Sequence, residues 1–226
     1  MAGTCSLIFE TSTPHASLAL AMPDGTLESQ NFTSDRSHNA VLFTPLQQLL
    51  ARSGGLEIGL VIVGSGPGSY SGTRVGIAAA QGVAIAAGCP AIAVASILAV
   101  PSAAHGEACL AIGDARRGSY WTAKVEHPHL ISTPELTDAA GLLEMIQIYL
   151  TAGHAVFSFE DPARFPLPAE MAAQVKLEFP TAALLWQAWL AADQVGRAAW
   201  ISQTPQPMYL KPPHITPSKR TWPANL

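Results

Sequence analysis

Residues 61–88 read VIVGSGPGSYSGTRVGIAAAQGVAIAAG, and three kinds of segment follow one another within them. Residues 60–63 are apolar and mostly β-branched, which is typical of a short buried strand. Residues 64–68 hold three glycines and a proline and therefore predict a turn. Residues 73–87 carry a single charge, at Arg74, and predict a helix that Gly88 ends.

The predicted helix is unusual in its content of small residues. Ser69 or Ser71 can cap its start by accepting a backbone N–H. Small residues recur every four positions on two faces, at Gly72, Gly76 and Ala80 and at Ala78, Gly82 and Ala86. Glycine inside a helix costs about 1 kcal/mol relative to alanine, and close approach of another segment is the usual reason for its presence. We therefore expect a helix that is packed closely on more than one side.

The glycine-rich turn could bind phosphate, because the free N–H groups at a helix N-terminus attract anions. A P-loop needs Lys before Ser or Thr at its end, whereas here Thr73 and Arg74 follow Gly72. The dinucleotide fingerprint is G-x-G-x-x-G, and here the third glycine comes one residue too late. The pattern favours a structural turn and leaves phosphate binding as the alternative.

Composition limits the classes of protein to which the chain could belong. It has 226 residues, 49% of them hydrophobic and 12% charged, which suits one domain or two small lobes. The net charge of −4 argues against a protein that grips nucleic acid by itself. The isolated Cys5, Cys89 and Cys109 are expected to be reduced. We expect a cytoplasmic protein without a signal peptide or membrane span, because the longest apolar run, residues 75–87, is too short to cross a bilayer.

Several motifs resemble those of one family. Residues 66–77, followed by Ala80-Gln81-Gly82, resemble the hallmark of the TsaB (YeaZ) family, subunits of the bacterial machinery that makes N6-threonylcarbamoyladenosine at position 37 of tRNA. The resemblance extends to the family's I-D-T-S at residues 9–12, its I-D-A-R motif at residues 112–120, its P-x-Y-L-R at residues 207–211 and the histidine of its first helix at His38. The chain departs from the pattern in having Glu10 for Asp, Gly113 inserted before Asp114, and Lys211 for Arg.

The expected elements form a similar series twice. Strands are predicted at 5–9, 16–22, 26–33, 60–63, 91–95, 108–112, 119–126, 130–133 and 155–159, and helices at 37–52, 73–87, 96–104, 137–150, 181–192 and 195–201. Three strands, a helix, a strand and a helix, used twice, are the plan of the actin/Hsp70-like ATPase (ASKHA, RNase H-like) fold, which the TsaB family shares. We therefore predict an α/β protein of two similar lobes, each with a mixed sheet and flanking helices.

The boundary between the lobes is expected near residue 104. The N-terminal lobe, residues 1–104, would contain the partner-binding helices. The C-terminal lobe, residues 105–226, has last helices that could pack back on the first lobe, and residues 211–226 would form a tail.

Hydrolytic chemistry is not expected, although the wider family was historically labelled glycoprotease, peptidase family M22. The H-x-x-x-H pair of the related TsaD is absent, because Leu42 stands four residues after His38. The chain has no H-E-x-x-H motif, and Ser69 and Ser71 lack the G-x-S-x-G surroundings of a hydrolase nucleophile. We predict no metal, no cofactor and no catalytic residue.

The resemblance implies a non-catalytic scaffold or dimerisation subunit that binds and supports a TsaD-like transferase. It also implies a TsaE-like ATPase as a second partner, a homodimer as a possible state of the chain alone, and contact with tRNA only through the complex. In TsaB-like proteins the first two helices form a bundle with the same helices of the partner. The interface is therefore predicted at His38, Val41, Leu42, Pro45, Leu46, Leu49, Gly72, Arg74, Val75, Gly76, Ala79, Ala80 and Val83. Gly76→Leu or Ala80→Trp is expected to abolish the complex and leave the monomer largely folded.

The alternative is a nucleotide-binding, actin-like enzyme that acts alone as an ATPase or as a carbamoyl or phosphoryl transferase. Its vestigial or active cleft would comprise Glu10, Gly66, Gly68, Ser69 and Asp114. The missing phosphate-binding Lys and the longer acid at position 10 argue against this alternative. A nucleotide bound at the TsaD interface, without hydrolysis by this chain, is a third possibility.

Overall fold

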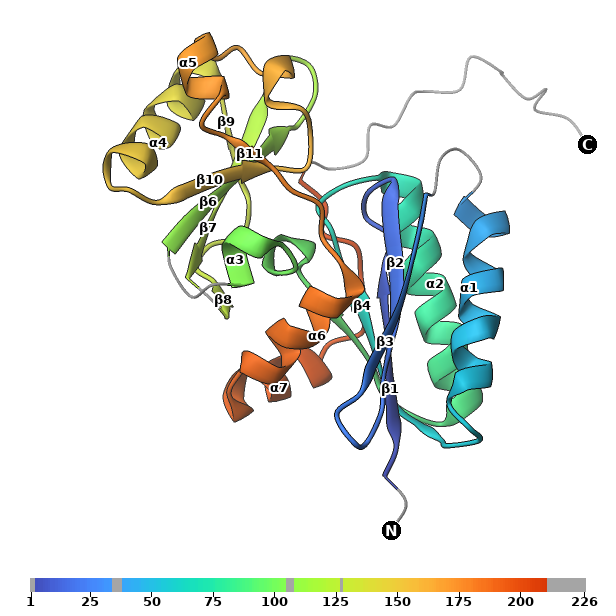
Figure 1. Ribbon diagram of the computed structural model, residues 1–226. Coiled ribbons are helices and arrows are strands. Elements are labelled where there is room, and N and C mark those ends of the chain that lie inside the picture. Colours follow the sequence, from blue (N-terminus) through green and yellow to red (C-terminus); the bar gives the residue numbers. More distant parts are fainter. Residues whose placement is uncertain (1–2, 34–37, 105–107, 127, 211–226) are drawn as a thin grey trace, which may run out of the picture.

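Two mixed β-sheets with flanking helices make up the molecule (Figure 1). The structure is a computed structural model and describes residues 3–33, 38–104, 108–126 and 128–210, with the backbone alone for residues 38–40. The first sheet has the strand order β3-β2-β1-β4-β5. Its strands are β1 (Cys5–Glu10), β2 (His15–Ala21), β3 (Leu27–Thr33), β4 (Ile58–Gly64) and β5 (Ala91–Val94). Strand β1 pairs antiparallel with β2 and parallel with β4.

The second sheet repeats this topology. Its order is β11-β10-β6-β7-β8, with β9 also paired to β7. The strands are β6 (Ala108–Asp114), β7 (Tyr120–Glu126), β8 (His129–Leu130), β9 (Glu135–Thr137), β10 (Ala155–Ser158) and β11 (Lys176–Leu177). Strand β6 pairs antiparallel with β7 and parallel with β10, as β1 does with β2 and β4. The predicted α/β fold, with two similar mixed sheets and flanking helices, is confirmed.

Helices cover both faces of the first sheet. Helices α1 (His38–Arg52) and α2 (Tyr70–Ala87) lie side by side on one face, and α6 (Ala182–Ala191) contacts β1, β2 and β4 from the other (Figure 1). Helix α7 (Gln194–Ile201) follows and contacts β5, while α4 (Ala139–Thr151) packs on the second sheet. None of the helices described within residues 3–210 is both long and apolar enough to cross a membrane.

Strand β1 is mostly apolar, at Cys5 and at residues 7–9, because both of its faces are buried. Side chains alternate between the two faces of a strand. Leu7 and Phe9 accordingly belong to the core under α1 and α2, whereas Ile8 belongs to the core between the two sheets. That second core also contains Leu185 of α6 and Phe157 of β10, so it joins the two halves of the chain.

Several boundaries differ from those expected. Helix α2 begins at Tyr70 rather than 73, because Ser69 caps it. The expected helix at 96–104 is divided into η1 (Ser96–Leu98) and α3 (Pro101–Ala104), since a proline begins the second piece. The strand expected at 130–133 is replaced by β8 and β9. The short η2 (Pro162–Arg164), α5 (Ala169–Ala172) and β11 have too few residues to show a hydrophobic period, and none was predicted.

Candidate functional site

The loop between β4 and α2, residues 65–69, is held by hydrogen bonds within the chain. The amide of Ser65 donates to Val94 O at 2.8 Å, that of Gly66 to Ser96 Oγ at 3.0 Å, and that of Ser69 to Ser12 O at 2.6 Å. Ser69 Oγ accepts from the amide of Gly72 at 3.2 Å and so caps α2. These amides are occupied and are not available to a phosphate group.

Glu10, at the end of β1, is completely buried beside this loop. Its Oε1 accepts from the amide of Ser12 at 2.7 Å, whereas Oε2 and Ser12 Oγ have no hydrogen-bond partner among the described residues. A Cβ at Gly64 would collide with the Glu10 carboxyl group, so this position requires glycine. Burial raises the pKa of Glu10 and favours its neutral form. A metal ligand needs the deprotonated form, so this environment does not suit a metal-binding acid.

Small residues bring α2 close to the chain's own turn between β1 and β2. Thr11 Oγ1 donates to Gly72 O at 2.8 Å, and a Cβ at Gly76 would collide with the same hydroxyl group. A Cβ at Gly68 would likewise collide with the carbonyl group of Ser12. The close approach expected from the small residues is confirmed on this face of α2, but the segment that approaches belongs to the same chain.

Six residues of the predicted interface are therefore interior residues. They are Leu42, Leu46, Leu49, Gly72, Gly76 and Ala80, which are buried under the first sheet or its turn and cannot contact a partner. The remaining members are the half-buried Val41, Pro45, Val75, Ala79 and Val83, the exposed Arg74, and His38, whose side chain lies outside the described residues. Gly76→Leu or Ala80→Trp would insert atoms into this interior, so we now expect either change to destabilise the monomer itself.

The exposed side of α1 and α2 is a different set of residues, which we call the outer helix face. It comprises Phe43, Thr44, Gln47 and Ala51 of α1 and Ala78, Gly82 and Ile85 of α2. Phe43 is 60% exposed and Ile85 is 82% exposed. Ala78 and Gly82 belong to the second small-residue face noted in the sequence, but the predicted interface did not include them. Phe43 and Ile85 were missed, although their helical positions relative to the buried leucines and alanines could have identified them.

Next to this face, the C-terminal segment (residues 205–210) crosses α2 and the loop before it. Gln81 Nε2 donates to Pro205 O at 3.3 Å, and the amide of Met208 donates to Ser65 O at 2.8 Å. Arg74 Nε and Nη2 donate to Tyr209 Oη at 2.9 and 2.7 Å. A pocket of about 160 Å³ lies between the segment and the loop. Two motifs that are far apart in the sequence, residues 66–77 and 207–210, therefore meet at one site.

Comparison with known proteins identifies the family. The family model described as TsaD, tRNA N6-adenosine threonylcarbamoyltransferase, matches residues 30–147, which is more than half of the chain. The tRNA threonylcarbamoyladenosine biosynthesis protein TsaB of Escherichia coli (strain K12) is 34% identical over 122 residues. The chain belongs to the family of TsaD and TsaB (YeaZ) proteins.

Other members of the TsaD and TsaB family give the extent of the similarity. The TsaB protein of Haemophilus influenzae is 34% identical over 125 residues, which cover 53% of this chain and 52% of that protein. The match to the E. coli protein covers 51% of this chain and 52% of the relative, so the chain spans about half the length of the curated relatives it matches. The structure of YeaZ from Pseudomonas aeruginosa has a TM-score of 0.66 and 22% identity, covering 92% of this chain and all of that one, which shows that the fold is shared.

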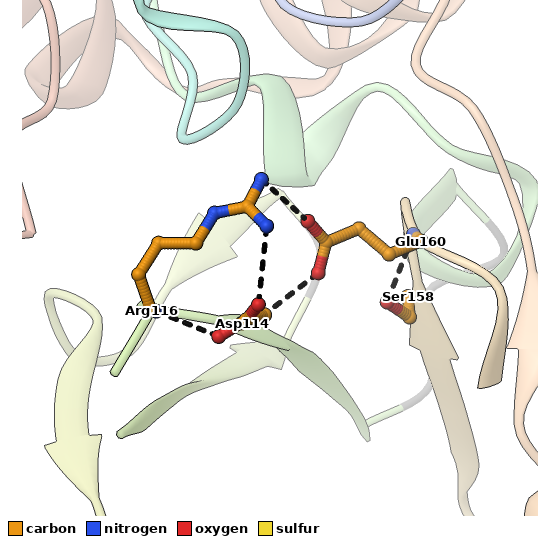
Figure 2. Close-up of polar contacts among 4 residues, drawn as sticks. All are labelled: Asp114, Arg116, Ser158 and Glu160. Carbon is orange, nitrogen blue, oxygen red and sulfur yellow. Dashed lines mark hydrogen bonds and ion pairs between the residues drawn. The ribbon is translucent and has the colours of Figure 1, made fainter. Parts of the chain in front are cut away.

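The acid of the family's I-D-A-R motif, Asp114, lies at the end of β6 and does not meet the loop. Its carboxylate accepts from the Arg116 amide at 2.6 Å and from Arg116 Nη1 at 3.3 Å, while Glu160 Oε2 accepts from the Asp114 amide at 2.9 Å (Figure 2). The backbone of Glu160 is held in turn, because its amide donates to Ser158 Oγ at 3.0 Å. The polar contacts of Asp114 are thus with Arg116 and Glu160, and no hydrogen bond or ion pair joins it to Glu10, Gly66, Gly68 or Ser69 among the described residues.

The turn after Asp114 has an uncommon backbone. Arg116 and Arg117 have φ values of 68° and 61°, in the left-handed region that non-glycine residues rarely adopt. The hydrogen bonds of Asp114 to Arg116 hold this conformation. The carboxylate therefore acts as a turn-forming group.

Metal ligands and reactive thiols were also sought. In the described part of the chain, no three His, Cys, Asp or Glu side chains lie close enough to share a metal ion. Cys5, Cys89 and Cys109 are free thiols. Burial raises the pKa of Cys109 to about 12, so this thiol stays protonated at neutral pH.

Proposed function

We propose that this chain takes part in making N6-threonylcarbamoyladenosine in tRNA as a non-catalytic subunit that docks a TsaD-like transferase. The names of the curated relatives support the pathway, and the TsaD family model supports the kind of partner. The observation that carries the proposal is the outer helix face, where Phe43 and Ile85 are 60% and 82% exposed on neighbouring helices.

The outer helix face has the properties of a packing surface. Ala78 and Gly82 on α2 are exposed, and a Cβ added at Gly82 would meet open space. Small side chains let a second backbone approach closely, while burial of a Phe or Ile side chain contributes about 1.5–3 kcal/mol. Affinity at this surface would come chiefly from packed apolar area, as in the centre of many interfaces.

The surroundings of the loop support a role without catalysis. The Glu10 carboxyl group is buried and favours its neutral form. The amides of Ser65, Gly66 and Ser69 are bonded within the chain. The Asp114 carboxylate accepts hydrogen bonds from Arg116, which gives it a turn-forming role without catalysis.

Further partners belong to the same proposal. A TsaE-like ATPase would join the pair, and tRNA would be bound by the complex, since this chain has a net charge of −4. The same outer helix face could join two copies of this chain when TsaD is absent. Such a complex would work in the cytoplasm, where tRNA is modified.

Co-expression with TsaD of the same organism tests the proposal. Phe43→Glu and Ile85→Glu should each remove the complex, because they place a charge in a packed apolar interface. Ile148→Glu on α4 is the matched control, since Ile148 is 52% exposed but lies on the second lobe. Each variant should elute alone in size-exclusion chromatography with wild-type circular dichroism, while the control co-elutes with TsaD.

Normal complex formation by both glutamate variants would contradict the proposed docking surface. A wild-type chain that forms no complex but hydrolyses ATP, with turnover lost in Asp114→Ala, would instead support the independent enzyme. Sizing the isolated chain, with and without Ile85→Glu, reports whether the same face also forms a homodimer.

A further inference from the structure

One arginine at the edge of the outer helix face is held in place by two tyrosines. Arg74 Nε and Nη2 both donate to Tyr209 Oη, at 2.9 and 2.7 Å. The guanidinium carbon lies 3.9 Å from the centre of the Tyr70 ring and 5.6 Å from that of Tyr209. The hydroxyl group of Tyr70 also interacts with the guanidinium group, and Arg74 forms no ion pair within the described part of the chain.

The two tyrosines fix the guanidinium group without covering it. Tyr70 and Tyr209 are 59% and 51% exposed, and Arg74 is itself exposed. The C-terminal segment is anchored on both sides of Tyr209, by the amide of Met208 on Ser65 O and by packing of Leu210 against the larger core. Most of the conformational entropy that a free arginine loses on binding is therefore already lost before any partner arrives.

Arg74 lies on the same side of α2 as the outer helix face. Residues 74, 78, 82 and 85 follow one another at helical spacing on the exposed side of α2. A protein that packs on Ala78, Gly82 and Ile85 thus reaches the exposed guanidinium group. Arginine and tyrosine are, with tryptophan, enriched among the dominant contacts of interfaces.

We propose that Arg74 is a specificity-determining contact that binds a carboxylate of the docked protein partner, and that Tyr209 positions it for this contact. The inference rests on the proposed function and adds the chemistry that the partner must present. A carboxylate suits a single guanidinium edge, which can donate to it in a defined geometry. A phosphate of tRNA is less suitable, because the amides of Ser65, Gly66 and Ser69 are bonded within the chain and the chain is acidic overall.

Affinity measurements with purified TsaD of the same organism test this inference. Arg74→Gln should weaken binding roughly tenfold, and the loss should shrink at high salt because it is electrostatic. Tyr209→Phe, which keeps the ring and removes the acceptor, should weaken binding less. The double variant should be no weaker than Arg74→Gln alone, since Tyr209 acts through Arg74. Arg164→Gln, an exposed arginine of the second lobe, is the control and should bind as the wild type.

Charge reversal identifies the carboxylate. Arg74→Glu should abolish binding, and one Asp→Lys or Glu→Lys change on TsaD should restore it. Unchanged affinity of Arg74→Gln in a wild-type complex that does form would overturn this inference and leave the proposed function intact. Unchanged TsaD affinity with weaker tRNA binding by the complex would assign Arg74 to phosphate instead and overturn the carboxylate. Absence of any wild-type complex would overturn the proposed function and this inference together.

Discussion

Glu10 is the residue whose environment departs furthest from that of an ordinary acid. The side chain is fully buried, one carboxyl oxygen has no partner among the described residues, and burial raises its pKa above the ordinary value of 4.5. The folded protein therefore keeps the proton of this carboxyl group to a higher pH than the unfolded chain does. The contribution of Glu10 to stability consequently falls as the pH rises through 4.5 and continues to fall until the folded-state pKa is reached.

Glu10→Gln removes this titration and keeps the shape of the side chain. We expect the variant to be more stable than the wild type at pH 7, by about 1.4 kcal/mol for each unit by which the pKa is raised. The difference in stability between the two proteins should vanish below pH 4.5, where Glu10 is protonated in both the folded and the unfolded wild-type chain. Urea unfolding between pH 4 and pH 8 measures it. The same pH dependence in both proteins would show that Glu10 ionises normally.

The environments of individual residues could be predicted only in part from the sequence. Glu10 was recognised as an unusual acid at the turn, but its burial depends on Gly64 and Ser96, which no local pattern connects to it. The docking of Tyr209 on Arg74 joins residues 135 positions apart, and nothing in the motif at residues 207–211 indicates which surface it meets. Lys211 and the cations of the tail lie outside the described residues.

At the scale of elements, α2 has two faces of small residues with opposite environments. Gly76 lies against Thr11, whereas a Cβ at Gly82 would meet open space. The sequence shows both faces with the same spacing and therefore does not distinguish the side that packs on the chain itself from the side left exposed. This ambiguity explains why the buried Gly72, Gly76 and Ala80 were placed in the predicted interface.

Replacing each glycine with alanine separates the two faces. Gly82→Ala should stabilise the protein by about 0.5–1 kcal/mol, because alanine favours the helix and fits without contact. Gly76→Ala should destabilise it by about 1–3 kcal/mol, because the new methyl group collides with the Thr11 hydroxyl group. Thermal and urea unfolding of the two variants provide the comparison. Equal effects at both positions would contradict the close contact of α2 with Thr11.

Elements with strong local signals were predicted well. The meander β1–β3 was found because each strand is short, apolar or alternating and bounded by turn residues such as Pro23-Asp24-Gly25. The region of η2, α5 and β11 was not, because two- to four-residue elements are formed by tertiary contacts and not by periodicity. The repeated order of the two sheets could be predicted since it depends on the sequence of elements and not on their exact limits.

At the scale of the whole molecule, one core joins the two sheets. It includes Ile8 and Ile62 of the first sheet, Ala111 and Phe157 of the second, and Leu185 of α6. The backbone also crosses between the halves, as the amide of Ala182 donates to Ser17 Oγ at 2.8 Å. We therefore expect the two lobes to unfold together.

Leu185→Ala tests this cooperativity. Leu185 has no exposed surface, so the variant should lose about 2–4 kcal/mol of stability. Tryptophan fluorescence and far-ultraviolet circular dichroism should show a single coincident transition in both proteins. Leu190→Ala in the same helix, where the side chain is 53% exposed, should have a much smaller effect. Two separate transitions in the wild type would contradict the shared core.

The contact between Arg74 and Tyr209 also has a consequence for the order of biosynthesis. The two residues are separated by 135 positions. At translation rates of about 5–20 residues per second, the ribosome adds Tyr209 roughly 7–27 seconds after Arg74. A nascent or truncated chain would therefore expose the outer helix face with its arginine still free to move. A partner that binds Arg74 only when Tyr209 positions it would therefore bind finished chains in preference to incomplete ones during assembly.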